Sequence, residues 1–186
     1  MKIVVGITGA TGVIYGVRLL EKLASHSVET HLVMSQWGKK TLELETSLTV
    51  EEVQGLANYH YDEFDLAGAI ASGSFLHDGM VIAPCTMKTL AGIRHGFSQN
   101  LIQRAADVTL KEGRKLILMP RESPLSTIHL ENMLGLSQMG VKIVPPMPAF
   151  YHQPQTIEEI IDSSIHRVLD LLGIQREYPK RWGNLS

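Results

Sequence analysis

Several short stretches place small, hydroxyl-bearing or cationic residues directly after apolar runs, where they could bind a phosphate group. The first is Gly9-Ala10-Thr11-Gly12, a flexible turn that leads into a helical pattern. Its hydroxyl and the N–H groups of a helix start would suit a phosphate. The same stretch could be a tight strand-to-helix turn with Thr11 as a plain cap. It lacks both the GxGxxG pattern of dinucleotide sites and the Gly-Lys-Ser/Thr ending of triphosphate loops.

Two later stretches carry similar chemistry. Thr86-Met87-Lys88-Thr89 adds two hydroxyls and an ammonium at the start of another helical pattern, although a capped surface helix would look the same. Pro120-Arg121-Glu122 places a guanidinium and a carboxylate between an apolar run and a Ser-capped helix, where a plain surface ion pair is the alternative. The sequence leaves both pairs of alternatives open.

Other reactive residue types give weaker signals. Cys85 follows an apolar run and is expected to be a buried small hydrophobe, because a reactive thiolate needs an electropositive, partly open setting. The eight His residues show no metal-ligand spacing such as HExxH, so no metal is expected. His129 is expected to be structural. Trp182 could stack on a planar ligand, or it could fasten the C-terminal tail.

Composition excludes several classes of partner. With 17 Lys and Arg against 19 Asp and Glu, the net charge is -2, so no broad field favours nucleic acid or an anionic membrane. The single Cys excludes an intrachain disulfide and fits a cytoplasmic protein. No apolar stretch approaches the roughly 18 residues that span a bilayer. The apolar start of the chain is interrupted by Gly and Thr, which disfavours a signal peptide.

The elements that must position these residues alternate between two patterns. Nearly continuous apolar runs predict buried parallel strands, and helical spacing fills the gaps between them. The strands are expected at residues 3–8, 30–34, 80–83, 116–119 and 142–144, and the helices at about 13–24, 101–110 and 157–172. Capping boxes begin at Thr49 and Thr156, and Gly113, Gly140 and Gly173 stand where helices should end. Residues 54–78 are less regular.

This alternation predicts a single α/β domain over residues 1–186, with a mostly parallel sheet between two helix layers and a tail from about residue 174 that packs on the body or on a neighbour. Ligands of such sheets bind beyond the carboxyl ends of the strands. The segments that follow the five strands, namely 9–12, Ser35, 84–89, 120–127 and 145–152, are therefore expected to converge.

Taken together, these segments resemble the flavin prenyltransferase family (UbiX-like), in particular members encoded beside phenolic-acid decarboxylases. The resemblance extends from Lys2 to Trp182 and is carried by the strings GITGATGVIYG, SGSFLHDGMVIAPCTMKTLAGI, NLIQRAADVTLKEGRKLILMPRESPLSTIHLENM and PPMPAFYHQPQT. It implies a Rossmann-like flavoprotein that moves a dimethylallyl group from dimethylallyl phosphate to N5 and C6 of FMN. The prenylated FMN would serve a UbiD-type decarboxylase of aromatic acids.

The resemblance also implies roles for individual residues. FMN would be held by Gly9, Ala10, Thr11, Ser35, Thr86, Met87, Lys88, Thr89 and Arg121; the prenyl phosphate would be held by Lys111, Tyr151 and Arg167, with Trp182 as an aromatic wall. Glu45 and Glu122, together with Lys111, would act in catalysis. Thr11 and Thr86 stand where many relatives have Ser, so each keeps the hydroxyl and adds a methyl.

By the same resemblance, the assembly would be a homo-dodecamer with sites at subunit junctions, so that Tyr151 and Arg167 act on a neighbour's flavin. The chain has no Asp-rich motif for Mg²⁺, which agrees with a monophosphate donor neutralised by side chains. Three other functions compete with this hypothesis: a cysteine-decarboxylase-type flavoprotein, a non-catalytic FMN-binding accessory subunit, and a direct aromatic acid decarboxylase.

Overall fold

The computed structural model describes residues 1–174. Its centre is one six-stranded sheet in the order β3-β2-β1-β4-β5-β6, with all five strand pairs parallel. The strands are β1 (Lys2–Ile7), β2 (Glu29–Met34), β3 (Tyr59–Tyr61), β4 (Gly79–Cys85), β5 (Lys115–Pro120) and β6 (Lys142–Ile143). The five predicted strands are confirmed. Strand β3 was not predicted.

Seven α-helices and a short 3-10 helix connect the strands in this part of the chain. They are α1 (Val13–Ser25), α2 (Gln36–Glu45), α3 (Val50–Gly55), η1 (Ala69–Ala71), α4 (Met87–Arg94), α5 (Leu101–Lys111), α6 (Thr127–Gln138) and α7 (Ile157–Leu172). The three predicted helices correspond to α1, α5 and α7. Gly113, Gly140 and Gly173 follow helices α5, α6 and α7 with positive φ angles, as their positions in the sequence predicted.

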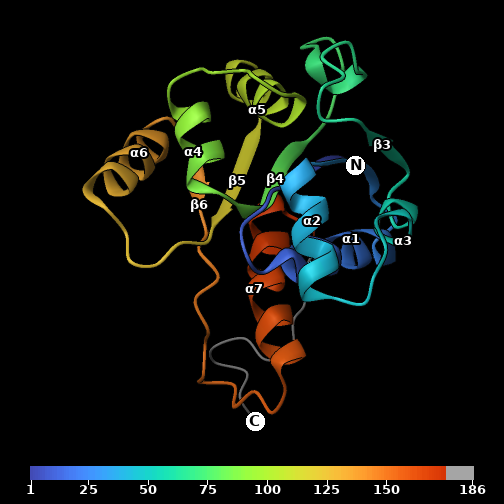
Figure 1. Cartoon of the computed structure of the whole chain (residues 1–186), viewed down its shortest axis with the longest axis vertical. Helices are drawn as coiled ribbons and strands as arrows, with labels where there is room; N and C mark the ends of the chain where they lie inside the picture. The colour runs from blue at the N-terminus through green and yellow to red at the C-terminus, as the bar shows by residue number, and fades with distance from the viewer. Residues whose placement is uncertain (175–186) are drawn as a thin grey trace.

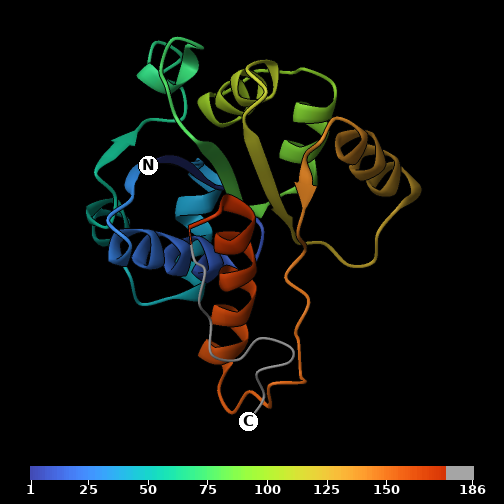
Figure 2. The same cartoon turned by 180° about the vertical axis from the view of Figure 1, so that it is seen from behind.

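Alternate side chains of each central strand enter two separate cores, because successive residues point to opposite faces of a sheet. Ile3, Val5 and Ile7 of β1 pack with α1 and α7, whereas Val4 packs with the helices α4, α5 and α6. Figure 2 shows α1 and α7 together in front of the sheet, and Figure 1 gives the opposite view. These layers confirm the expected Rossmann-like three-layer sandwich.

Two glycines allow the close packing at the start of α1. Gly12 precedes the helix with a φ of 92°, a conformation that favours glycine. Gly16 lies where α1 crosses the sheet, and a Cβ there would collide with the Ala83 carbonyl oxygen and the Ile7 side chain. The helix is therefore held directly against β1 and β4.

The order of the strands fixes where a ligand should bind. The chain moves outward from β1 to β2 and β3 on one side, and from β4 to β5 and β6 on the other. The point where this direction reverses lies between β1 and β4, and parallel sheets bind ligands beyond the carboxyl ends of the strands at such a point. Gly9 and Thr86 follow β1 and β4, and so flank it.

Candidate functional site

A cavity of about 440 Å³ opens at this point of the sheet. Its volume lies in the range of small-molecule sites, roughly 300–1,000 Å³. Five of its lining residues were predicted from the sequence, namely Gly9, Ser35, Thr86, Lys88 and Thr89. The others were not predicted: Gln36, Trp37, Glu63, Phe64, Gln99, Asn100 and Gln103. The sequence therefore identified the lining residues that follow strands β1, β2 and β4, and it missed the other seven.

Hydroxyl groups join the ends of β1 and β4 at the floor of the cavity. The Thr8 hydroxyl donates to the Pro84 carbonyl oxygen at 2.8 Å and accepts from the Thr86 N–H at 2.9 Å. Thr86 then caps α4, since its Oγ1 accepts from the Thr89 N–H at 3.2 Å and donates to the Thr89 hydroxyl at 3.0 Å. This network orients the predicted hydroxyl pair at the start of α4.

Helices α2, α4 and α5 all begin at the cavity, which makes this end of the molecule favourable for an anion. Ser35 caps α2 by accepting from the Gly38 N–H at 3.0 Å, and Asn100 caps α5 by accepting from the Gln103 N–H at 3.0 Å. Lys88 adds an ammonium in the first turn of α4. The carboxylate of Glu63, which also lines the cavity, accepts from groups at the starts of α2 and α5. The start of α4, with Lys88 and two threonine hydroxyls, is therefore the part of the cavity that best suits a phosphate monoester.

Helix α1 also begins near this edge, but its start is occupied by the protein itself. Glu45, at the end of α2, accepts from the Gly12 N–H at 2.8 Å and the Val13 N–H at 3.1 Å. Residue Gly12, and not Thr11, is the N-cap of α1, and it makes no side-chain cap bond. The reading of Thr11 as a plain cap is therefore wrong. Within the described chain the carboxylate of Glu45 accepts from these two N–H groups, and a phosphate held by residues 9–12 stays a prediction.

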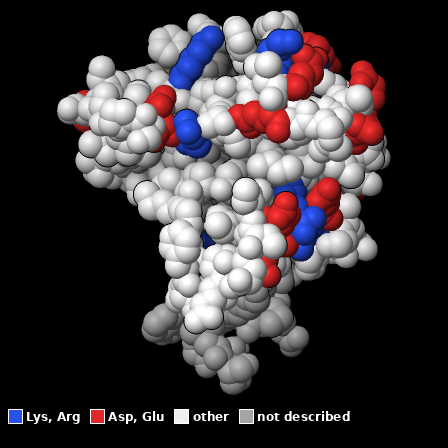
Figure 3. All heavy atoms as spheres, turned by 60° about the horizontal axis from the view of Figure 1, so that its bottom comes forward, with Lys and Arg blue, Asp and Glu red and all other residues white. Residues whose placement is uncertain are grey.

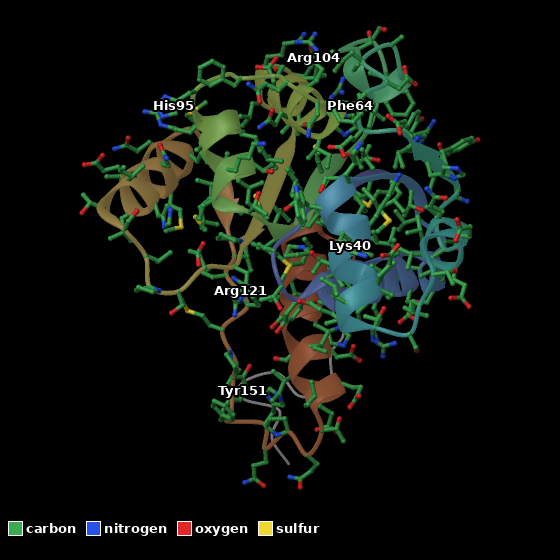
Figure 4. All side chains as sticks on the ribbon, viewed as in Figure 1. Lys40, Phe64, His95, Arg104, Arg121 and Tyr151 are labelled. Atoms are coloured by element: carbon green, nitrogen blue, oxygen red, sulfur yellow. The ribbon has the colours of Figure 1, made fainter. Side chains whose placement is uncertain are left out.

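The Pro120-Arg121-Glu122 segment lies beside the same edge. The Arg121 N–H donates to the Cys85 carbonyl oxygen at 3.3 Å. Arg121, which follows β5, therefore lies beside the end of β4, where Thr86 begins the next segment. Its side chain and that of Glu122 are exposed, and Glu122 accepts from the Ser123 N–H at 3.0 Å. In Figure 4, Arg121 lies between the ends of the strands and the segment that carries Tyr151. No Arg121–Glu122 ion pair occurs in the described chain.

Three predicted residues lie apart from the cavity within one chain. Lys111 is at the far end of α5, next to Glu112 at 2.5 Å, and α5 runs from the cavity back to the start of β5. Tyr151 lies on residues 144–156, which extend away from the sheet (Figure 1). Arg167 lines a different hollow between α6, β6 and α7. The expected convergence thus holds for 9–12, Ser35 and 84–89, each of which lines the cavity, and for 120–127 only at its start, where Arg121 meets Cys85. Segment 145–152 does not line this cavity.

Several other expectations can be compared with the structure. Cys85 is fully buried, and this burial raises the pKa of its thiol, which agrees with a small hydrophobe. His129 completes a capping box with Ser126, which is a structural role. Within residues 1–174, no three His, Cys, Asp or Glu side chains are grouped as metal ligands, and no helix is long and apolar enough to cross a membrane. Trp182 and the tail lie outside the described residues.

Comparison with known proteins gives a consistent pattern. The family described as Flavoprotein matches residues 1–169. A probable UbiX-like flavin prenyltransferase of Escherichia coli O157:H7 is 57% identical over 186 residues, which cover 100% of this chain and 94% of that protein.

Two solved structures extend the comparison to three dimensions. A dodecameric FMN-dependent UbiX-like decarboxylase from Escherichia coli O157:H7 superimposes with a TM-score of 0.95 at 57% identity, covering 98% of this chain and 99% of that chain. AnUbiX (PadA1), solved in complex with FMN and dimethylallyl pyrophosphate, has a TM-score of 0.92 at 48% identity, covering 95% and 96% of the two chains.

Proposed function

Because this chain belongs to the flavoprotein family and, within it, to the UbiX-like flavin prenyltransferases, we propose that it transfers a dimethylallyl group from dimethylallyl phosphate to reduced FMN. The observation that carries the proposal is the cavity between β1 and β4, where three helices begin beside two hydroxyls and Lys88. In the reaction, the allylic carbon–oxygen bond would break and phosphate would leave as a bond forms to N5, which loses its proton. The second bond, to C6, would consume the double bond of the allyl group, with the proton of C6 released and a proton added to the other alkene carbon.

The two ends of the site would have different tasks. Thr86, Lys88 and Thr89 would hold the phosphate end of FMN, and Ser35 would contact the nucleotide from the start of α2, with Gly9 allowing the nucleotide to approach the backbone. Ala10, Thr11 and Met87, which lie within two residues of a lining residue in the sequence, and Arg121, whose N–H donates to Cys85, would contact the flavin or the prenyl phosphate. Preorganised cationic donors such as Arg121 stabilise negative charge as it develops on a leaving phosphate. No metal is required by this scheme.

Glu122 and Glu45 are two carboxylates near this edge of the sheet, and either could accept a proton from the flavin once the first carbon–nitrogen bond has formed. Glu45 is held by two N–H groups of α1, which fixes its position. Glu122 is exposed and is bonded only to the adjacent backbone in the described chain. We expect Glu122→Gln to slow the alkylation in a single turnover.

Lys111, Tyr151, Arg167 and Trp182 would bind the prenyl phosphate at a junction between subunits. Lys111 is separated from its own cavity by the length of α5, about 15 Å at 1.5 Å per residue. It could therefore reach a substrate only in another subunit. The solved relative that superimposes at 0.95 is described as dodecameric, which supports a homo-dodecamer for this chain.

The downstream partner is inferred from the resemblance to UbiX-like proteins. A prenylated flavin made here would be handed to a UbiD-type decarboxylase of aromatic acids, in the cytoplasm, with no nucleic acid or membrane involved. An accessory subunit that only binds FMN is the competing function, and it would leave dimethylallyl phosphate intact. At 57% identity to a flavin prenyltransferase, the chain is not assigned to the cysteine decarboxylases.

A direct assay tests the proposal. The purified chain, reduced FMN and dimethylallyl phosphate are mixed without oxygen, and the flavin is analysed by mass spectrometry. We expect the flavin to gain one prenyl unit, and a parallel reaction with the diphosphate shows whether that donor is used. An unchanged flavin mass together with intact donor would overturn the proposal in favour of the accessory role.

The role of Lys111 can be tested separately. Lys111→Ala should retain FMN but lose turnover, because the residue lies far from its own cavity. Lys40→Ala is the matched control, since Lys40 is an exposed lysine on α2 that pairs with Glu43 and does not line the cavity. If the Lys111→Ala protein purifies without flavin, Lys111 contributes to FMN binding, and its assignment to the prenyl phosphate is wrong.

A further inference from the structure

Glu63 is a buried carboxylate that lines the cavity and has no part in the function proposed above. Its exposed fraction is 6%, whereas acidic side chains are rarely so buried unless they are paired. It lies in the turn between β3 and η1. The turn is set by the Asp62 side chain, which accepts from the Phe64 N–H at 2.8 Å.

Two helix starts hold this carboxylate in place. One oxygen accepts from the N–H of Gln36, the first residue of α2. The other accepts from the amide of Asn100, the N-cap of α5, at 3.2 Å, and the Glu63 carbonyl oxygen accepts from the Leu101 N–H at 2.7 Å. Both partners favour a negative charge, because helix starts carry partial positive charge. The carboxylate is therefore fixed rather than free to rotate out.

The carboxylate retains acceptor capacity beyond these bonds, and Glu63 lines the cavity. An ionised carboxylate can accept about four hydrogen bonds, and the described residues provide one for each oxygen. A ligand that presents hydroxyl groups to this wall would supply the remaining donors. A phosphate would be repelled from the same wall, so the anion should lie towards Lys88, Thr86 and Thr89 instead.

We propose that Glu63 accepts a hydrogen bond from a ribityl hydroxyl of the bound flavin nucleotide and so fixes which end of it lies against α4. The inference rests on the proposed function in so far as the ligand is FMN. It assigns opposite walls of one cavity to opposite parts of the nucleotide: Lys88 and the two threonines take the phosphate, and Glu63 takes the polyol between the phosphate and the ring.

Three flavins separate the contacts of each part. Lumiflavin has the ring without the polyol, riboflavin adds the polyol, and FMN adds the phosphate. Dissociation constants for all three are measured by flavin fluorescence with the wild type, Glu63→Gln and Glu43→Gln. The last variant is the control, because it removes the same charge from an exposed site on α2 outside the cavity.

The expected result is specific to the polyol. Glu63→Gln should raise the dissociation constant of riboflavin by about tenfold or more, as for loss of a hydrogen bond to a charged group. The dissociation constant of lumiflavin should not change. Glu43→Gln should alter none of the three. If the Gln variant does not fold, as judged by its thermal unfolding, Glu63→Asp withdraws the carboxylate by one methylene and should give the same pattern.

Three other patterns would overturn the inference. An equal change for all three flavins would mean that Glu63 only ties α2 to α5. Tighter binding of FMN with unchanged binding of riboflavin would place Glu63 beside the phosphate. Unchanged dissociation constants for all three flavins would mean that Glu63 does not contact the ligand. Failure of the wild type to bind FMN would instead overturn the proposed function, so the two failures are distinguishable.

Discussion

At the scale of single residues, Glu45 illustrates how one side chain can decide the use of a helix start. The carboxylate supplies the acceptor that α1 lacks in its own cap. It also occupies this helix start, so under the proposed function a phosphate would bind at α4, where Thr86 and Lys88 lie. The position of the proposed anion site would thus depend on a residue that is distant in sequence.

Removing this cap should have a measurable cost. We expect Glu45→Ala to lower the free energy of unfolding by about 1 kcal/mol, as for other lost N-caps, and Glu45→Gln to lower it less because its amide oxygen can still accept. Urea denaturation of the two variants and the wild type measures the difference. Equal stabilities for Glu45→Ala and the wild type would show that water replaces the carboxylate at no cost.

Cys85 gives a second test at this scale. The thiol is fully buried at the end of β4, and this burial raises its pKa, so it should remain protonated and unreactive at neutral pH. We expect iodoacetamide at pH 8 to leave the native protein unmodified and to label it after unfolding in guanidinium. Rapid labelling of the native chain would mean that the thiol is accessible.

The cavity residues show which part of a site can be predicted from sequence. Gly9, Ser35 and Thr86 were predicted because each follows a buried strand, and the rule for parallel sheets identifies such positions. Glu63 and Gln103 were not predicted, because they reach the cavity from a turn after an unrecognised strand and from the first turn of a helix. Their contribution depends on how α2, α4 and α5 pack together.

At the scale of elements, the edges of the sheet were harder to predict than its centre. The central strands are continuous apolar runs buried on both faces, so the pattern is unambiguous. Strand β3 has only three residues, Tyr59–Tyr61, which are exposed or half-buried at the edge of the sheet. A short exposed strand has no apolar run to reveal it, and only its register with β2 defines it.

The packing of α1 against α7 depends on one ionic cluster that can be tested. Asp162 of α7 accepts from the Arg18 guanidinium at 2.5 and 3.0 Å and lies 3.1 Å from the Lys22 ammonium. Burial alone would raise the pKa of Asp162, but the hydrogen bonds and charges of Arg18 and Lys22 outweigh it, so the pKa is lowered from 3.8. The cluster therefore stabilises the fold in its charged form.

The sign of the pH dependence follows. A carboxyl whose pKa is lowered by folding contributes its full stabilisation above the unfolded value and loses it as the pH falls through the folded value. We expect Asp162→Asn to lower the free energy of unfolding at pH 7 by on the order of 1 kcal/mol, allowing for partial solvent screening. The difference from the wild type should shrink below pH 3.8. Glu21→Gln, which removes a more exposed partner of Arg18, should have a smaller effect.

At the scale of the whole molecule, the segment between β6 and α7 projects from the body with apolar side chains exposed. Met147 and Phe150 have exposed fractions of 73% and 68%, and Ile157, the first residue of α7, has 72%. In Figure 3, the projecting part of the described chain carries few charged side chains, whereas acidic and basic residues are interspersed elsewhere on that face. Such a surface is suited to burial against neighbouring subunits, as the proposed dodecamer requires.

Mixed oligomers test whether sites are shared. The Lys111→Ala chain should be inactive because Lys111 is proposed to act in the site of a neighbouring subunit. The Lys88→Glu chain should be inactive because the introduced carboxylate would repel the phosphate from its own cavity. Co-expressed in equal amounts, the two inactive chains should recover roughly a quarter of wild-type activity, because one site in four would combine an intact cavity with an intact neighbour. The control is co-expression of the Lys111→Ala chain with a chain that carries both Lys88→Glu and Lys111→Ala, which should give no activity. Mixed oligomers with no activity would confine each site to one chain.

The course of α5 has a consequence for any shared site. Its first turn lines the chain's own cavity, and its last residue, Lys111, is the one assigned to a neighbour. Under the proposed function, this helix is a spacer that sets both the separation and the relative rotation of two reaction centres. A single inserted residue in its exposed middle would leave the first turn in place but turn Lys111 by about 100° around the axis. Helix length would then be constrained by the geometry of the assembly as well as by the stability of the fold.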